Sequence, residues 1–212
     1  MGVTEPEILL TADPALTLRK APDDEVDSVL LRSGIPPRGQ YLCFALRRWK
    51  GFEEKAPIFG AAAEYAYRTY GLTPVFVAVE KHLDPGAGQL AARGLTIPHY
   101  FLNDAGSAGT IIGALSRMQA VVSMRLHALI FAAGQGIPLA GVVYDPKVSA
   151  FLRYIGQDLF VDLADLTETD LRSMIDQCVA QAAHPETQEA AVRTLQAMEH
   201  KNVEVARRLL KS

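Results

Sequence analysis

The sequence has little cysteine, no long apolar run and no strong excess of charge. Its 212 residues include only two cysteines, Cys43 and Cys178, too few for a disulfide framework or a zinc site. The longest apolar runs fall well short of the roughly 20 residues that a membrane helix needs. A net charge of −3 gives no strong field for nucleic acid or an anionic membrane. These absences predict a reduced, soluble, cytoplasmic protein without a transmembrane segment or a nucleic-acid partner.

The composition that remains is typical of a globular chain. Apolar residues make up 49% and charged residues 21%, and the mean hydropathy is +0.09. A disordered tail would be more polar and more charged, and collagen has a different composition. The N-terminus lacks a basic region followed by an apolar stretch, so no signal peptide is expected. A chain of this length can bury a sizeable core in one or two domains.

The first 38 residues differ from the rest of the chain. They contain an acidic cluster at residues 23–25 and five prolines: Pro6, Pro14, Pro22, Pro36 and Pro37. Prolines remove backbone donors and interrupt regular elements. We therefore expect a linker over residues 1–38, one regular domain over residues 39–183, and a long charged helix in residues 184–212.

From residue 39 onward, apolar runs of strand length alternate with helical patterns. The expected strands are 40–46, 74–79, 99–102, 120–124, 139–144 and 158–162. The expected helices are 57–70, 87–93, 109–118, 126–134, 147–155, one that begins at the capping-box pattern of Thr167 and Asp170, and 185–211. Continuously apolar strands between helices indicate a parallel sheet covered on both faces. The predicted fold class is α/β, a doubly wound Rossmann-like sheet with strand order 3-2-1-4-5-6.

Two polar clusters follow the strands at which this order reverses. Arg47 and Trp49 come after the first strand, and Arg125 and His127 come after the fourth. Ligands bind outside the carboxyl ends of these two strands. Two guanidiniums beside a helix N-terminus form a site for a phosphate or a carboxylate, and a histidine there is suited to proton transfer. A single arginine or histidine is more often structural, so the hypothesis depends on the two clusters meeting.

Other patterns have ordinary structural explanations. Residues 86–91 match G-x-G-x-x-A, but a lone match is weak and this one follows the second strand, so we expect a glycine-rich turn into a helix. The remaining histidines have no metal-like spacing. Asp145 is expected to cap the next helix, with Pro146 as its first residue. Because its strand neighbours the fourth, contact with a ligand is the alternative role of Asp145.

One long segment of the sequence resembles a known family. Residues 123–156, which begin SMRLH and contain YDPK, closely resemble the C-terminal half of bacterial polysaccharide pyruvyl transferases. The LRRW stretch at 46–49 resembles the family's R-x-W, and Asp84 stands where the family tends to carry an aspartate after the second strand. Residues 11–16 resemble the D-P-A-L stretch that links the two halves. The resemblance extends from about residue 11 to residue 180.

The resemblance implies the donor-binding C-terminal domain of a GT-B-like transferase. Such enzymes transfer pyruvate from phosphoenolpyruvate to a sugar of a cell-wall polysaccharide or its lipid-linked precursor as a ketal, and the product anchors S-layer proteins. By resemblance, Arg125, Leu126 and His127 hold phosphoenolpyruvate and assist proton transfer. Arg47, with Trp49, contacts the anion. Phosphoenolpyruvate is the donor substrate, so neither a cofactor nor a metal is expected.

The resemblance covers half of such an enzyme. Because GT-B-like active sites lie between two halves, we expect residues 1–38 to lead in from a missing N-terminal domain and the isolated chain to turn over poorly. The expected location is the cytoplasm, with the inner face of the membrane as an alternative. Two other functions stay open: a GT-B glycosyltransferase or sugar-nucleotide epimerase domain, and a non-catalytic domain for anion binding or assembly.

Overall fold

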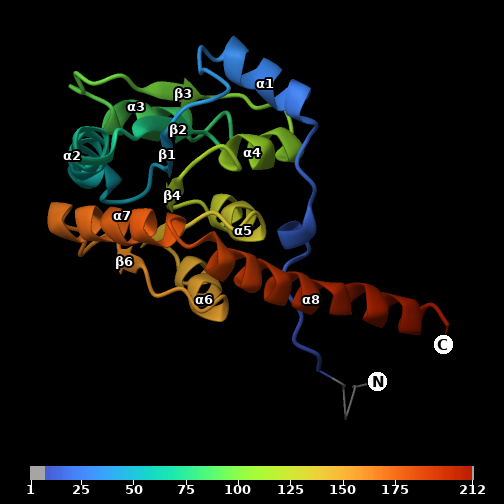
Figure 1. Ribbon diagram of the computed structural model, residues 1–212. Helices are drawn as coiled ribbons and strands as arrows, with labels where there is room; N and C mark the ends of the chain where they lie inside the picture. The colour runs from blue at the N-terminus through green and yellow to red at the C-terminus, as the bar shows by residue number, and fades with distance from the viewer. Residues whose placement is uncertain (1–7, 212) are drawn as a thin grey trace.

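The computed structural model describes residues 8–211 and contains a six-stranded parallel sheet (Figure 1). The strands are β1 Tyr41–Ala45, β2 Thr73–Val77, β3 Tyr100–Leu102, β4 Ala120–Ser123, β5 Leu139–Val143 and β6 Phe160–Asp162. Their order is β3-β2-β1-β4-β5-β6, so the predicted doubly wound order is confirmed. Ala45 pairs with Ser123, which places the carboxyl ends of β1 and β4 side by side.

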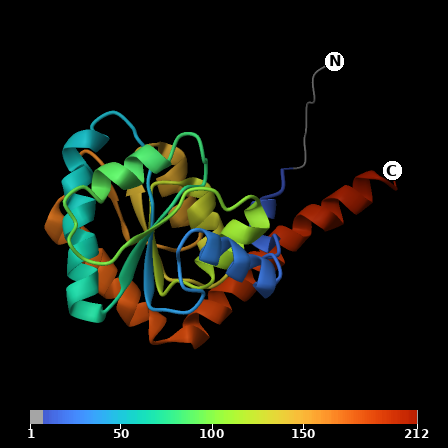
Figure 2. The ribbon, with the colours of Figure 1, turned by 90° about the horizontal axis from the view of Figure 1, so that it is seen from above.

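Helices cover both faces of the sheet (Figure 2). They are η1 Pro14–Thr17, α1 Asp23–Arg32, α2 Phe52–Tyr70, α3 Pro85–Ala91, α4 Ala108–Leu115, α5 Leu126–Gly134, α6 Pro146–Tyr154, α7 Glu168–Ala182 and α8 Pro185–Leu209. Side chains alternate along β1, so Cys43 belongs to one core cluster and Phe44 to the other. Helices α1, α4, α5 and α6 cover the first cluster, and α2, α3 and α7 cover the second.

The N-terminal segment contains helices that its prolines do not predict. Pro22 immediately precedes α1, where a missing N–H removes no bond within the helix. Carboxylates fill the first turn of α1, and the helix dipole favours them there. Leu16, Val26 and Leu30 are buried in the core. The described part of the expected linker therefore packs into this domain, while its first seven residues lie outside the described chain.

Helix α2 also differs from its predicted start, because it begins at Phe52 and not at Pro57. Gly51 adopts a left-handed conformation with φ of 81° before the helix, and Phe52 is fully buried. Burial of that ring fixes the first turn, and the helix continues through Pro57 although the proline lacks an N–H. The capping box predicted from Thr167 and Asp170 at the start of α7 is confirmed.

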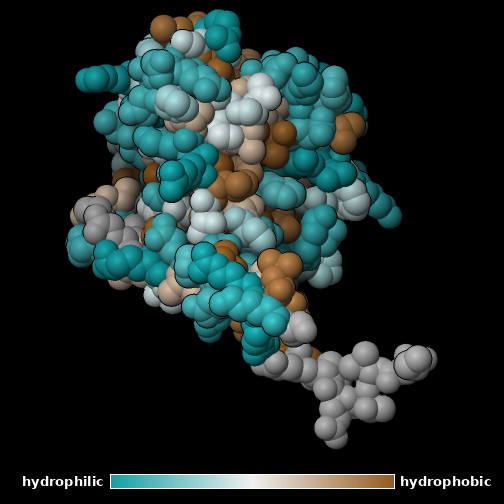
Figure 3. Space-filling view, turned by 90° about the vertical axis from the view of Figure 1, so that its right-hand side faces the viewer, coloured by the Kyte–Doolittle hydropathy of each residue, from teal (hydrophilic) through white to brown (hydrophobic). Residues whose placement is uncertain are grey.

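Helix α8 extends away from the sheet and packs against the N-terminal segment (Figure 1). Asn202 Nδ2 of α8 donates to the Ala12 carbonyl at 2.8 Å. The hydroxyl of Tyr154, the last residue of α6, donates to the adjacent Thr11 carbonyl at 3.2 Å. Seen from the side toward which α8 points, the surface is mostly hydrophilic with small groups of apolar side chains (Figure 3). Among residues 8–211, no helix combines the length and the apolar character needed to cross a membrane.

Candidate functional site

The cluster that follows β1 is built around Arg47, which is partly buried. The central guanidinium carbon lies 5.3 Å from the centroid of the Trp49 ring and 5.7 Å from that of the Tyr144 ring. Nη1 lies 3.5 Å from the Tyr144 hydroxyl, and the two rings are 4.9 Å apart. Cation–π contacts of this kind orient a guanidinium without neutralising it. The charge of Arg47 therefore stays available to an anion.

The cluster that follows β4 is fixed by Ser123, the fully buried last residue of that strand. Its Oγ accepts a hydrogen bond from the Arg125 N–H at 2.8 Å. The same hydroxyl can donate to the Ala45 carbonyl at 3.2 Å or to the Arg125 carbonyl at 3.0 Å. Helix α5 begins directly afterwards at Leu126, which packs against the core. Ser123 thus ties together the ends of β1 and β4 and fixes the backbone from which the Arg125 side chain leaves.

Arg125 forms a buried ion pair with Asp84, which immediately precedes α3. Arg125 Nε is 3.3 Å from Asp84 Oδ2, and the two side chains are 14% and 1% exposed. The same oxygen accepts the backbone N–H groups of Val79 at 3.1 Å and Glu80 at 2.8 Å. Burial raises the pKa of the Asp84 carboxyl, while backbone hydrogen bonds and the guanidiniums of Arg125 and Arg47 oppose that rise. Asp84 therefore anchors Arg125 and experiences the charge of both arginines.

Each member of this ion pair has one unused polar atom. Arg125 Nη1 and Asp84 Oδ1 are buried and have no hydrogen-bond partner among the described residues. Buried polar atoms are nearly always paired, and an unpaired one costs about 1–3 kcal/mol. An anion that accepted a hydrogen bond from Nη1 would remove that cost. Arg125 therefore has unused donor capacity for a phosphate or a carboxylate, which would reach the buried Nη1 only after a local rearrangement.

His127, the second residue of α5, is exposed and lines a hollow of about 440 Å³. The loops that follow β2 and β3 form the hollow, which Glu80, His82 and Asp104 also line. The His127 ring is 6.1 Å from the Phe131 ring. The imidazole is accessible from solvent at the start of a helix, and a ligand there could exchange a proton with it.

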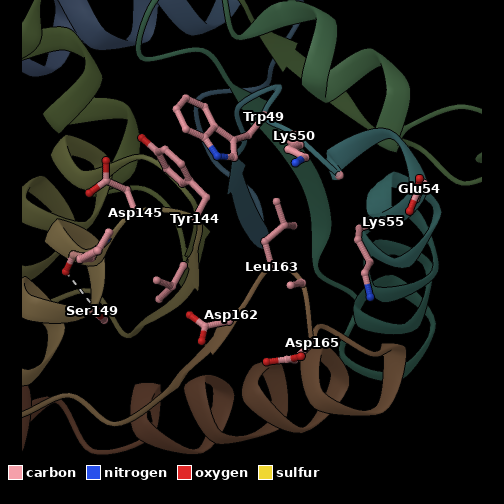
Figure 4. A pocket seen from close by; sticks show the side chains of 14 residues that line it. Trp49, Lys50, Glu54, Lys55, Tyr144, Asp145, Ser149, Asp162, Leu163 and Asp165 are labelled. Atoms are coloured by element: carbon pink, nitrogen blue, oxygen red, sulfur yellow. Dashed lines mark hydrogen bonds between the residues drawn. The ribbon is translucent and has the colours of Figure 1, made fainter.

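A larger cavity of about 770 Å³ lies at the ends of β1, β5 and β6 (Figure 4). Trp49, which is 46% exposed, and Asp145 both line it. Asp145 Oδ1 accepts the Lys147 N–H at 3.0 Å and caps α6, with Pro146 as the first helical residue. The predicted capping role of Asp145 is confirmed, and its contact with a ligand stays a prediction.

The structure brings the two clusters to one edge of the sheet, but they do not line one common pocket. The positive charges of Arg47 and Arg125 both oppose the rise in the pKa of the Asp84 carboxyl. His127 lines the smaller hollow, whereas Trp49 and Asp145 line the larger one. The arginines line neither hollow. The candidate site is therefore an open edge with hollows at both ends and not one closed pocket.

Sequence patterns do not identify the partners of the two arginines. Tyr144 follows β5, and β4 lies between β5 and β1, so its contact with Arg47 spans a whole strand. Asp84 stands before Pro85, a pattern that usually marks a helix cap. Its carboxylate instead turns back to the loop after β2. Only the position of Asp84 after the second strand could have marked it as a candidate partner.

The G-x-G-x-x-A stretch at residues 86–91 forms nearly all of the short helix α3 and not the glycine-rich turn that we expected before a helix. A Cβ at Gly88 would lie 3.0 Å from the Cβ of Phe76, so the glycine permits close packing of α3 on β2. Within the part of the chain that the structure describes, no group of three or more His, Cys, Asp or Glu side chains could hold a metal ion.

Solved structures with a similar fold include GT-B glycosyltransferases, which confirms the predicted fold class. ADP-heptose LPS heptosyltransferase II of E. coli matches with a TM-score of 0.56 and 14% identity, over 76% of this chain and 53% of that chain. The glycosyltransferase VinC, solved in complex with dTDP, matches with a TM-score of 0.56 and 16% identity, over 82% of this chain and 42% of that chain. This chain thus spans about half the length of these relatives or less.

A family model gives the more specific comparison. Comparison with the curated proteins gives no match, but the model of polysaccharide pyruvyl transferases matches residues 1–146. The matched region contains both arginine clusters, Asp84, His127 and Asp145. It therefore includes most of the chain and the ends of β1, β2, β4 and β5, but not the end of β6 that lines part of the larger cavity. The chain belongs to the polysaccharide pyruvyl transferase family.

Proposed function

We propose that this chain binds phosphoenolpyruvate and forms the donor half of an enzyme that transfers pyruvate to a sugar. The observation that carries the proposal is the state of Arg125. It is held by the buried Asp84, keeps one unpaired guanidinium nitrogen, and stands at the start of α5, where the helix dipole favours an anion. Arg47 supplies a second guanidinium from the adjacent strand end. Phosphoenolpyruvate carries a phosphate and a carboxylate, and arginine binds both groups well.

The proposed reaction converts two sugar hydroxyls and phosphoenolpyruvate into a cyclic ketal and inorganic phosphate. C3 of the enol gains a proton and becomes a methyl group. One hydroxyl oxygen bonds to C2, the C2–O bond to phosphate breaks, and the second hydroxyl oxygen then bonds to C2. One hydroxyl proton replaces the proton delivered to C3, and the other leaves with the phosphate. The reaction is balanced without an oxidant or a reductant.

The residues of the open edge suit the separate parts of this reaction. Arg125 and Arg47 would hold the phosphate and the carboxylate, and they would stabilise the charge that develops as phosphate leaves. His127, near the start of the same helix as Arg125, would move a proton to C3 or from an attacking hydroxyl. Leu126 would contribute the first N–H of α5 beside the anion.

A complete active site would need a second domain. Because the chain spans about half the length of its GT-B neighbours, we propose that an N-terminal half faces the open edge and that the isolated chain binds phosphoenolpyruvate but turns over poorly. The family supports a polysaccharide acceptor. We propose a cell-wall polysaccharide or its lipid-linked precursor, pyruvylated in the cytoplasm at the inner membrane face and later used to anchor S-layer proteins.

A sugar-nucleotide transferase is the second candidate, because the structural neighbours include a glycosyltransferase solved with dTDP. Such an enzyme needs a cavity that accepts a nucleoside diphosphate. The 770 Å³ cavity is large enough, but four carboxylates and two lysines line it. That balance disfavours a diphosphate. The third candidate, a non-catalytic anion-binding or assembly domain, would share the arginines but bind neither phosphoenolpyruvate nor a sugar nucleotide.

Thermal unfolding with ligands distinguishes these functions. We expect phosphoenolpyruvate to raise the Tm of the full chain, because a ligand that binds only the folded state stabilises it. UDP-sugars and NAD should leave the Tm unchanged. Arg125→Ala should remove the shift and His127→Ala should reduce it, while Arg93→Ala, an exposed arginine after α3 that lines neither hollow, should keep it. Stabilisation by a UDP-sugar alone would contradict the proposal, and no shift with any ligand would favour the third candidate.

A further inference from the structure

The 770 Å³ cavity takes no part in the proposed donor chemistry, yet it lies beside Arg47. The ends of β1, β5 and β6 and the first turns of α2 and α6 surround it (Figure 4). Its volume falls within the range of about 300–1,000 Å³ that is typical of small-molecule sites. The residues that line it therefore show which class of molecule would fit.

One wall of the cavity is aromatic. Trp49 and Tyr144 lie with their ring centroids 4.9 Å apart, and the Arg47 guanidinium lies over both rings. Trp49 nevertheless stays 46% exposed. An aromatic ring carries negative charge on its face, so it attracts the polarised C–H groups of a sugar ring. Because Arg47 and Tyr144 hold the indole, this wall needs little ordering when a ligand binds.

The floor of the cavity carries unpartnered carboxylates. Asp162 and Asp165 lie across the cavity from Trp49 and Tyr144 (Figure 4). The Asp165 N–H donates to the Asp162 carbonyl at 3.0 Å and closes the turn that holds both residues. Neither carboxylate has a hydrogen bond or an ion pair within residues 8–211. An ionised carboxylate only accepts hydrogen bonds. A ligand that pairs with these two groups must therefore carry hydroxyl or amide N–H donors.

The charge of the lining argues against an anionic ligand. The ionisable groups are four carboxylates and two ammonium groups: Glu54, Asp145, Asp162, Asp165, Lys50 and Lys55. Lys55 Nζ already donates to the Leu166 carbonyl at 2.9 Å. Four negative charges against two positive charges repel a phosphate or a nucleoside diphosphate. A neutral ligand with several hydroxyl groups meets no such repulsion.

We infer that this cavity binds one uncharged glycosyl unit, with its apolar face on Trp49 and its hydroxyls on Asp162 and Asp165. The binding itself is argued from the cavity alone. Its purpose rests on the proposed function: the bound unit would belong to the acceptor, placed next to the donor through Arg47. Arg47 contacts the aromatic wall, and its positive charge also interacts with the Asp84 carboxylate that pairs with Arg125.

The chain supplies its own reporter for this test, because Trp49 is its only tryptophan. The full chain is titrated with methyl β-galactopyranoside and methyl N-acetyl-β-glucosaminide, and with UDP and inorganic phosphate as charged comparators. We expect a saturable change in tryptophan emission with at least one glycoside and none with UDP or phosphate. The double variant Asp162→Ala and Asp165→Ala should weaken that response at least about tenfold, the loss expected from about 1.5 kcal/mol of charge-assisted hydrogen bonding. Asp158→Ala, an exposed aspartate outside the cavity, should leave it unchanged.

The outcomes separate this inference from the proposed function. A glycoside response without phosphoenolpyruvate binding by the same protein would support the cavity and overturn the donor site. Phosphoenolpyruvate binding without a response to either glycoside at millimolar concentration would overturn the glycosyl site and leave the donor site standing. A stronger response to UDP than to the glycosides, or a glycoside response that survives the double variant, would also overturn the inference.

Discussion

The two strand ends at the centre of the sheet hold their arginines in opposite ways. After β4, Arg125 is 14% exposed and ion-paired with a carboxylate that is 1% exposed. After β1, Arg47 lies against the faces of Trp49 and Tyr144 and has no carboxylate at hydrogen-bond distance within residues 8–211. The first arrangement fixes a guanidinium by charge, and the second fixes it by aromatic contact.

Because they are held differently, we expect the two arginines to have different roles. Arg125 belongs to the folded core of the site, because loss of its partner would leave a buried charge unpaired. Arg47 is a partly buried group that can bind an anion on one side while it contacts the aromatic wall of the 770 Å³ cavity on the other. Perturbations near Arg125 should therefore affect stability and binding together, whereas perturbations near Arg47 should affect binding alone.

Asp84→Ala should have the largest effect on stability. It leaves the Arg125 guanidinium buried without its partner and removes the acceptor of two backbone N–H groups. Breaking a buried pair in this way costs about 3–5 kcal/mol, which urea denaturation measures as a lower midpoint at an unchanged slope. Asp104→Ala removes an exposed carboxylate that pairs with Lys81 and should change the midpoint far less. Equal losses in the two variants would mean that the Asp84 pair is not a buried anchor.

Ser123→Ala should come next. It removes the hydroxyl that accepts the Arg125 N–H and donates to a neighbouring carbonyl at the end of β4. A buried polar group left without a partner costs about 1–3 kcal/mol, and the turn that leads to Arg125 should loosen. Amide hydrogen exchange at the start of α5 should rise together with the loss of stability. Unchanged exchange there would show that the strand end does not depend on the Ser123 hydroxyl.

Arg47→Ala should weaken binding with little loss of stability. The variant removes one charge-assisted contact to the donor, so phosphoenolpyruvate should bind at least about tenfold more weakly, the loss expected from about 1.5 kcal/mol. The Tm without ligand should stay close to that of the parent chain, since Arg47 forms no ion pair among the described residues. Arg48→Ala, the neighbouring exposed arginine that pairs with Glu53, is the matched control. A large drop in the Tm of Arg47→Ala would erase the contrast between the two strand ends.

The pH dependence of stability gives the smallest and most specific effect. Because burial raises the pKa of Asp84 in the folded state, that state binds the proton more tightly than the unfolded state does. The contribution of Asp84 is then full below the ordinary aspartate pKa of about 3.9 and is lost as pH rises through the raised value. We compare the unfolding free energy of the parent chain with that of Asp84→Asn. The difference, parent minus variant, should fall as pH rises from the ordinary aspartate pKa through the raised pKa of Asp84. A rise over the same interval would show that the Arg125 charge outweighs burial.

Much of the fold could be predicted from the sequence because burial on both faces leaves a clear pattern. The strand of residues 41–45 is apolar throughout, and such strands alternate with amphipathic helices, which permits few topologies other than a doubly wound sheet. The N-terminal segment was harder, since Pro22 suggests an interruption whereas it precedes the first turn of α1. Whether a proline starts or interrupts a helix depends on tertiary packing, here the burial of Val26 and Leu30.

The candidate site could be predicted only in part. Strand order placed the residues after β1 and β4 at one edge, because carboxyl ends of parallel strands share an edge. It could not place Tyr144 against Arg47, since that contact depends on how side chains reach across β4. The pairing of Arg125 with Asp84 likewise depends on the path of the loop after β2, which local patterns do not determine.

Calorimetric titration of the full chain with phosphoenolpyruvate, in parallel with Arg125→Ala, tests the donor site most directly. We predict saturable binding to the parent chain, no detectable binding to Arg125→Ala, and no binding of UDP to either protein. Phosphoenolpyruvate binding of equal strength to both proteins, or binding of UDP in its place, would contradict the assignment of Arg125 to the donor anion.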